Sequence, residues 1–471
     1  MNNRLIRNNY TNFIILLILT TAAFLRANWY GDLRLSIGNA ETGGYIDASR
    51  APILSWKIFA GQRLFTTNII FKMANDPQNC IITAYSEPAR GLEDFRANQP
   101  CFDNIALLQN FLAIFGWSFL AWTTSKWMQN PFTKIIAASV VVAFGFTPQI
   151  AEWESILSPE SLSLSMFAIT LGLAQETALR ASTSEKHFES KIERFLLAGW
   201  LIFFLLWVFV RDVHLYSIPI TLVLITLLLI VKKFRNTKSL AIPITLIILF
   251  IFFIIGFVSA RDSLRATRYP VINALDEFIW PHPQRVAYFR EFGMPERKSP
   301  YYQEWADVNA TKAYGIFLLS HPGFIATTLW EYTDELNSDS VQPYFFAPEV
   351  KNRSTLLIIG EMFHPQTSAV YLISLLLLLS LVVHAIQLRT PTLLAWAWLA
   401  VWFFAVAAVT LLLGFFGDTS GLRRHIMPSV EMFRLFIWVF IMPFLDLSLR
   451  QFKSPGKEYL SNQRGDQPNN E

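Results

Sequence analysis

Charged side chains are scarce in this sequence. Asp, Glu, Lys and Arg together make up 16% of the 471 residues, whereas soluble proteins carry about a quarter. A chain of this length with so little polar surface cannot cover itself in water, so an ordinary soluble protein is excluded. The net charge of +4 is also small, and it gives no sign of the basic surface that binds nucleic acid.

Cysteine and the common catalytic motifs are equally scarce. The two cysteines, Cys80 and Cys101, are too few for a cysteine-rich zinc site. The sequence contains no HExxH zinc motif, no phosphate-binding GxxxxGK[ST] loop and no GxSxG serine elbow. Zinc hydrolysis, nucleotide hydrolysis and serine-nucleophile chemistry therefore have no support. We expect no cofactor, although a divalent metal on carboxylates stays open.

Apolar residues, in contrast, make up 53% of the chain and occur in long blocks. FLLAGWLIFFLLWVFV (195–210) and LAIPITLIILFIFFIIGFVSA (240–260) approach the length of about 20 residues that crosses a bilayer. We therefore predict an all-α polytopic membrane protein with about ten transmembrane helices. The predicted spans are 11–28, 104–123, 133–149, 161–178, 195–212, 215–232, 239–259, 368–387, 392–415 and 430–449.

Positive charges in the short connections indicate the sidedness. Lys and Arg gather in alternate connections, as in VKKFRNTK (231–238), and near both termini. Because such residues stay in the cytoplasm, both termini are predicted to lie inside. The long segments 29–103 and 260–367 then lie outside. We expect one transmembrane domain over residues 1–450 and a disordered cytoplasmic tail over 451–471.

Three local features of the predicted topology need a separate reading. FIILLILTTAAFL could be a cleaved signal segment, but Trp29 and Tyr30 are typical interfacial anchors of a retained span. An oxidising compartment permits a disulfide between Cys80 and Cys101, with two separate buried thiols as the alternative. The apolar stretch 311–332 is interrupted by His321-Pro322, so we expect an outer or interfacial helix there.

Ionisable residues gather at the predicted outer ends of the spans. GNAETGGYIDASR (38–50) places Glu41 and Tyr45 four residues apart, beside glycines that let the backbone approach a ligand. WESILSPESL places Glu160 directly after Pro159, where a helix N-terminus favours negative charge. Solvated helix caps explain each residue singly. Acids and bases from several helices on one face nevertheless predict a polar site at the membrane surface.

The segment GDTSGLRRHIMPSV (417–430) adds a basic group to the same face. Arg423, Arg424 and His425 stand directly before the last predicted span. Snorkelling would explain one such arginine. Two arginines and a histidine beside an aspartate favour a phosphate site, because guanidinium groups bind phosphate through paired hydrogen bonds.

Taken in order along the chain, these motifs resemble the GT-C superfamily of integral-membrane glycosyltransferases, bacterial members in particular. The resemblance lies in an acidic residue soon after the first span, in QRLFTTNIIFKM (62–73), in SILSPESLSLSMF (155–167) and in GDTSGLRRHIMPSV. Two departures matter. Position 41 is Glu where the family acid is more often Asp, and the segment around Arg63 lacks the family's proline. Asp32 therefore stays as an alternative carboxylate.

The resemblance implies that a sugar passes from a polyprenyl-phosphate donor to a hydroxyl of a glycan, lipid or protein, on the outer face of a bacterial inner membrane. It implies Glu41 as the general base, with Asp32 second. Arg423, Arg424 and His425 would hold the departing phosphate, with Arg211 and Arg261 in reserve. The remaining substrate-binding candidates are Tyr45, Arg63, Glu154 and Glu160.

Two other functions compete with sugar transfer. A polysaccharide ligase or polymerase acting on lipid-linked glycans would show a similar outer face. A transporter or flippase would place ionisable groups near the bilayer midplane. The predicted spans are almost free of charge, which disfavours transport.

Overall fold

The computed structural model describes residues 2–61, 63–74, 80–83, 97–184, 188–230, 239–263, 265, 269–344 and 352–452. Its regular structure over these residues is helical, which confirms the predicted all-α class. Extended pairing among them is limited to isolated bridges from Ile37 to Asn98 and from Ile37 to Ile156. The connection 231–238 and the tail from 453 onward, for which we predicted cytoplasmic positions, lie outside the described residues.

Each predicted span coincides with a helix. These helices are α1 (Asn2–Trp29), α5 (Asp103–Lys126), α6 (Pro131–Phe146), α8 (Pro159–Thr183), α9 (Lys191–Val208), α11 (Ser217–Leu228), α13 (Ala241–Asp262), α21 (Ala369–Leu388), α22 (Pro391–Gly417) and α23 (Leu422–Phe452). Among the described helices, 7 are long and apolar enough to cross a membrane, or up to 8 if the pair bent by 49° after Phe146 is one span. That α9 and α11 also cross remains a prediction, because α9 starts with charged residues and α11 is short.

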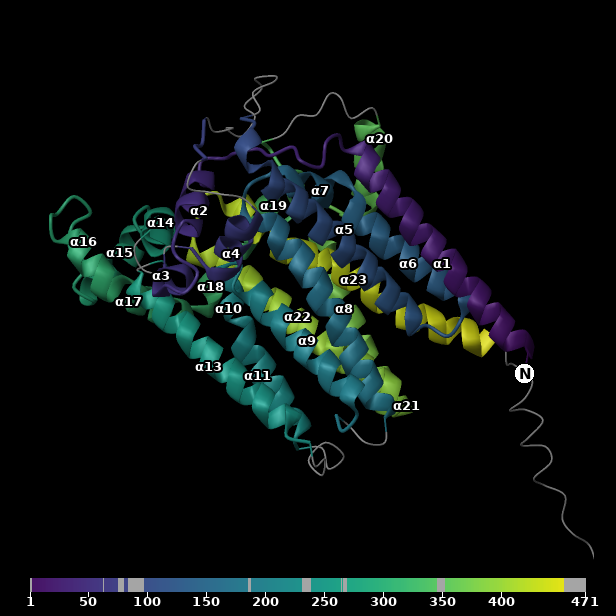
Figure 1. The fold of residues 1–471 in the computed structure, drawn as a ribbon. Coiled ribbons are helices and arrows are strands. Elements are labelled where there is room, and N and C mark those ends of the chain that lie inside the picture. The colour runs from purple at the N-terminus through teal and green to yellow at the C-terminus, as the bar shows by residue number, and fades with distance from the viewer. Residues whose placement is uncertain are drawn as a thin grey trace, which may run out of the picture.

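The long helices lie side by side, with short helices gathered at one end (Figure 1). Prolines occupy the first turns of α6, α8 and α22, where a missing N–H costs nothing. Small residues allow close packing: a Cβ on Gly145 would lie 2.2 Å from the Trp117 ring, and one on Gly116 would lie 2.7 Å from the Ser165 carbonyl oxygen. These contacts lock α5 between α6 and α8.

The short helices come mainly from the two long polar segments. They are α2 (Thr42–Ser49), α3 (Trp56–Ala60), α4 (Phe65–Ala74), α14 (Tyr269–Phe278), α15 (Pro283–Glu291), α16 (Tyr302–Trp305), α17 (Thr311–Ser320), α18 (Pro322–Glu331), α19 (Thr333–Leu336) and α20 (Arg353–Phe363). The stretch 311–332 is divided at His321 into α17 and α18, at the interruption that the sequence indicated.

A disulfide joins Cys80 to Cys101. Of the two alternatives, a disulfide or two separate buried thiols, the structure therefore shows the disulfide. At the opposite end of the bundle, Glu176 in the last turns of α8 pairs with Lys126 at 2.5 Å and Arg180 at 2.8 Å. Because Glu160 lies in the first turn of the same 25-residue helix, these basic residues are separated from it by the length of α8.

Candidate functional site

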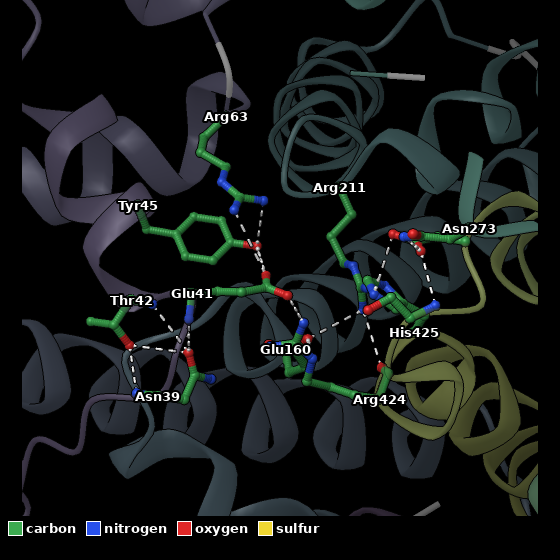
Figure 2. Close-up of polar contacts among 12 residues, drawn as sticks. Asn39, Glu41, Thr42, Tyr45, Arg63, Glu160, Arg211, Asn273, Arg424 and His425 are labelled. Carbon is green, nitrogen blue, oxygen red and sulfur yellow. Dashed lines mark hydrogen bonds and ion pairs between the residues drawn. The ribbon is translucent and has the colours of Figure 1, made fainter. Parts of the chain in front are cut away.

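The predicted site residues come from helix ends that meet at one end of the bundle. Glu41 follows α1 and precedes α2, while Glu160 is in the first turn of α8. Arg211 precedes the short helix α10 (Asp212–Leu215), which follows α9. Arg424 and His425 lie in the first turn of α23. Residues that are hundreds of positions apart in the chain therefore contribute to one cluster (Figure 2).

The loop that carries Glu41 is fixed by backbone contacts. Asn39 Oδ1 accepts hydrogen bonds from the backbone N–H groups of Glu41 and Thr42, at 3.0 and 3.1 Å. The Thr42 hydroxyl donates to the Leu157 carbonyl at 3.0 Å. Leu157 N in turn donates to the Ile37 carbonyl at 2.9 Å. Because the chain enters α8 directly after this pairing, the loop holds Glu41 and Glu160 in a fixed relation.

Glu41 is surrounded by cations and a phenol. Its Oε1 is ion-paired with Arg424, and its Oε2 lies 3.8 Å from Arg63 Nη2. The Tyr45 hydroxyl donates to Oε2 at 3.4 Å, and the Arg63 guanidinium stacks over the Tyr45 ring at 4.3 Å. The Glu41 side chain nevertheless keeps 32% of its surface exposed, so a ligand can still reach it.

Arg424 connects Glu41 to a deeper carboxylate. Arg424 Nε lies 3.6 Å from Glu160 Oε1, and Arg211 Nη1 lies 3.6 Å from the same oxygen. A cation in the first turn of a helix is disfavoured by the helix dipole, so Arg424 depends on both carboxylates. Glu160 is 1% exposed, and its Oε2 has no hydrogen-bond partner among the described residues.

His425 extends the cluster to the connection between α22 and α23. Arg211 Nη2 donates to His425 Nδ1 at 2.7 Å, and His425 Nε2 lies 3.6 Å from Asp418 Oδ2. Asp418 Oδ1 accepts from Asn273 Nδ2 at 2.9 Å and from the Ser420 backbone N–H at 3.0 Å. The site thus continues into α14 of the second polar segment.

A cavity of about 900 Å³ opens beside these residues. Glu41, Tyr45, Arg63, Arg211 and His425 line it. Mainly apolar side chains from α10, α14, α17, α22 and the start of α11 complete the wall, among them Val213, Tyr216, Val271, Leu318, Leu413 and Phe416. The cavity therefore presents charged groups and an apolar surface to the same ligand.

The surroundings of Glu41 and Asp418 shift the pKa values of these two carboxyl groups in opposite directions. Burial would raise the pKa of Glu41, but the positive charges of Arg424 and Arg63 together hold it below its usual value. Burial raises the pKa of Asp418, and the nearby Glu41 adds to this effect. Burial also raises the pKa of the Tyr45 phenol, which therefore stays a hydrogen-bond donor. Glu41 therefore stays ionised at neutral pH, and its carboxylate can accept a proton.

Four of the predicted residues lie apart from this cluster. Asp32 is exposed and accepts from the Arg34 backbone N–H at 2.9 Å. The Arg261 side chain is 72% exposed and pairs with its neighbour Asp262. Arg423 is exposed. Glu154 is buried, and its Oε2 accepts from the Ser161 hydroxyl. None of these four lines the cavity, and Arg424 and Glu160 belong to the cluster without lining the cavity.

Several residues of the site are not among the candidates chosen from the sequence. Asp418 and Asn273 line the cavity, as do Arg265 and Asp212, which are paired at 3.1 Å. Asp418 was noted beside the arginines of GDTSGLRRHIMPSV, but it was not chosen as a site residue. Asn273 lies in a polar segment that carried no recognisable spacing, so no signal pointed to it.

A second charged network was also missed, and it corrects one expectation. Glu431 and Arg434 lie inside the predicted span 430–449, paired at 2.6 Å and each 1% exposed. Buried Asp446 lies in the same span. The expectation that spans are almost free of charge is therefore wrong for α23, and the argument against transport drawn from it is weakened.

The arrangement suits a reaction that separates charge at a membrane surface. Ionised Glu41 can receive a proton, and Arg63 and Arg211 can hold an anion in the same cavity. Among the described residues, no group of three or more His, Cys, Asp or Glu side chains could hold a metal ion. Metal dependence stays a matter for experiment.

No protein-family model matches the chain, and no curated protein matches its sequence. The oligosaccharyltransferase AglB of Archaeoglobus fulgidus, solved with an inhibitory peptide and a dolichol-phosphate, is similar at 13% identity and a TM-score of 0.45, over 98% of this chain and 53% of that one. The apo form of the Archaeoglobus fulgidus enzyme is similar at 11% identity and 0.44, over 94% and 52%.

This chain thus spans about half the length of the structures it matches. The likeness is weak in sequence and partial in length, so the function is inferred from the residues of the site.

Proposed function

We propose that this membrane protein transfers a sugar from a polyprenyl-phosphate donor to a hydroxyl group of a glycan, lipid or protein. The observation that carries the proposal is the contact of Glu41 with Arg424 and Arg63 at a cavity that is both charged and apolar. A lipid-linked phosphate needs cations for its head and apolar surface for its chain. A hydroxyl acceptor needs a carboxylate near the reacting carbon.

In the proposed reaction, the acceptor oxygen attacks the anomeric carbon of the donor sugar. The bond between that carbon and the phosphate oxygen breaks, and the polyprenyl phosphate leaves with the electron pair. The acceptor proton passes to Glu41 and from there to water. Atoms and charge balance, because the products are a glycosylated acceptor, a lipid phosphate and a released proton.

The arginines would stabilise the phosphate as it gains charge. Arg211 and Arg63 line the cavity and share their carboxylate partners with Arg424, so an incoming phosphate could take over some of these contacts. Preorganised cations at the point where charge develops are the largest electrostatic contribution in many such reactions. The N-termini of α8 and α23 would add to the attraction for an anion.

The orientation that fits this role places the site outside. Basic residues lie at the opposite end of the bundle, and basic connections stay in the cytoplasm. The disulfide at the site's end is also typical of an oxidising compartment. We therefore place the site on the outer face of a bacterial inner membrane, with both termini inside.

The test uses the purified full-length chain in vesicles that contain radiolabelled polyprenyl-phosphate sugars. Mixed hydroxyl acceptors, comprising oligosaccharides, a glycolipid and peptides, are added outside. We expect release of free polyprenyl phosphate together with label on an acceptor. Donor that moves between leaflets with its sugar still attached would instead support a flippase, and no reaction with any donor would overturn the proposal.

A further inference from the structure

One wall of the cavity differs in chemistry from the cationic wall beside Glu41. It is formed by Asp418, which follows α22, and by Asn273 of α14. Asp418 Oδ1 is held by Asn273 and by the Ser420 backbone N–H. Asp418 Oδ2 lies 3.6 Å from His425 Nε2, which is too long for a hydrogen bond. This oxygen can therefore accept a hydrogen bond from a ligand.

The protonation of His425 follows from its other neighbour. An arginine side chain has only donors, so the 2.7 Å contact from Arg211 Nη2 requires His425 Nδ1 to accept. A neutral His425 then carries its proton on Nε2, which faces Asp418. The wall thus offers an N–H donor at His425 and a carboxylate acceptor at Asp418, next to the Asn273 amide.

Such a mixture suits hydroxyl groups better than it suits phosphate. A sugar hydroxyl both donates and accepts, so it can use an amide, a carboxyl and an imidazole N–H together. An acidic side chain would repel a phosphate, which the cations Arg63 and Arg211 at the same cavity attract. The arginines near Glu41 would therefore contact the phosphate of the donor, and Asp418 with Asn273 would contact its sugar.

The helix α17 supplies a further polar group to this cavity. Tyr314 is 5% exposed and lines the cavity. Its hydroxyl has no hydrogen-bond partner in the part of the chain that the structure describes. A buried hydroxyl without a partner costs free energy, and a bound sugar hydroxyl would relieve that cost.

We propose that Asp418 and Asn273, with His425 Nε2 beside them, form the subsite that binds the sugar hydroxyls and decides which sugar is transferred. The inference rests on the proposed function and extends it from a lipid-linked phosphate to the sugar. Asn273 comes from the second polar segment, so that segment takes part in donor selection.

The test compares epimers that differ in one hydroxyl. Polyprenyl-phosphate glucose, galactose and mannose are supplied to the reconstituted chain, and kcat/KM is measured for each. A hydrogen bond to a charged group contributes enough to give the wild type a preference of about 10–100-fold. We expect Asp418→Asn and Asn273→Ala to reduce that preference to about threefold, mainly by raising KM for the preferred epimer.

Glu277→Gln is the matched control, because Glu277 lies on the same helix α14 but does not line the cavity. Asp418→Asn keeps the size of the side chain, so it remains informative if Asn273→Ala fails to fold. Variants that turn over all three epimers with the wild-type preference would overturn the inference and leave the proposed function intact. A wild type that uses neither these three donors nor any other polyprenyl-phosphate sugar would remove both.

Discussion

Two charged clusters on the same helix α23 have similar composition and opposite properties. The first, near the start of the helix, joins Arg424 to Glu41 and Glu160. The second lies two turns later and joins Glu431 to Arg434 and His364. Each contains arginine, glutamate and histidine, so residue type does not distinguish them.

The second cluster is closed. Glu431 Oε2 pairs with His364 Nδ1 at 2.6 Å, and Glu431 Oε1 accepts from Arg434 and from the Ser340 hydroxyl. Arg434 also donates to the carbonyls of Ser338 and Pro365, both at 3.1 Å. These bonds tie the second polar segment to α23, and they use the capacity of both charged groups.

The first cluster is open. Glu41 and Arg63 each keep about a third of their side-chain surface exposed, at 32% and 33%. Glu160 Oε2 has no partner among the described residues, and a cavity adjoins the group. Access and unused hydrogen-bonding capacity therefore separate a candidate site from a structural network. The predictions below test this distinction.

The largest expected effect is on stability, from Glu431→Gln in the closed cluster. Arg434 would remain buried without its counter-charge, and breaking such a buried pair costs about 3–5 kcal/mol. We expect a clear fall in the thermal midpoint in detergent, measured by intrinsic fluorescence. Activity per folded molecule should stay near the wild-type value. A stable variant without activity would place the closed cluster in the reaction.

The next effect is on activity, from Arg424→Gln in the open cluster. Removing one group that stabilises the charge developing in the transition state costs about 10²-fold or more in turnover. The pH profile should also change. Arg424 holds the pKa of Glu41 down, so the wild type should stay active below the ordinary Glu value of about 4.3, while the acid limb of the variant moves to higher pH. Unchanged acid limbs in the residual activity would contradict the role of Glu41 as the base.

A smaller effect is expected from Cys80→Ser with Cys101→Ser. Arg50, directly after α2, donates to the Cys80 carbonyl at 2.6 Å. Gln99 N donates to the Ser36 carbonyl at 2.8 Å, in the segment before Glu41. The disulfide therefore braces both flanks of the Glu41 loop, and small displacements there should lower turnover by about tenfold.

Treatment of the wild type with a reducing agent serves as the control for the double serine variant, since it should reproduce the loss. Full activity of both samples would show that the loop holds Glu41 without the bridge. The thermal midpoint, measured on the same samples, separates a displaced Glu41 from general unfolding.

The meeting of these residues at one end of the bundle could be predicted from the sequence, because hydropathy fixes where the helix ends fall. Glu41, Glu160, Arg211 and Arg424 all stand at ends that share one side of the membrane, so their meeting required little further information. Asp32 and Arg423 stand at the same face but lie apart from the cluster. Side-chain direction depends on local turns, such as the one that Asn39 fixes through Glu41 N, and apolar patterning does not encode it.

The network around Glu431 and the place of Asn273 in the site could not be predicted, again because apolar patterning does not encode contacts between side chains. Glu431 and Arg434 lie in the mainly apolar stretch EMFRLFIWVFIMPF (431–444) of α23, and their partner His364 comes from a distant polar segment. Only the packed fold shows that they neutralise one another. Asn273 likewise is recognised as a site residue only through its hydrogen bond to Asp418, which lies 145 positions away.

The central claim is that the Glu41 carboxylate accepts the proton of the acceptor hydroxyl, and turnover of Glu41→Gln beside Asp32→Asn tests it most directly. Both variants are reconstituted with the polyprenyl-phosphate sugar that the wild type uses, and donor binding is measured in the same vesicles. We predict that Glu41→Gln binds donor but loses about 10²–10⁴-fold in turnover, whereas Asp32→Asn behaves as the wild type. Full turnover by folded Glu41→Gln, or its loss in Asp32→Asn alone, would contradict the account.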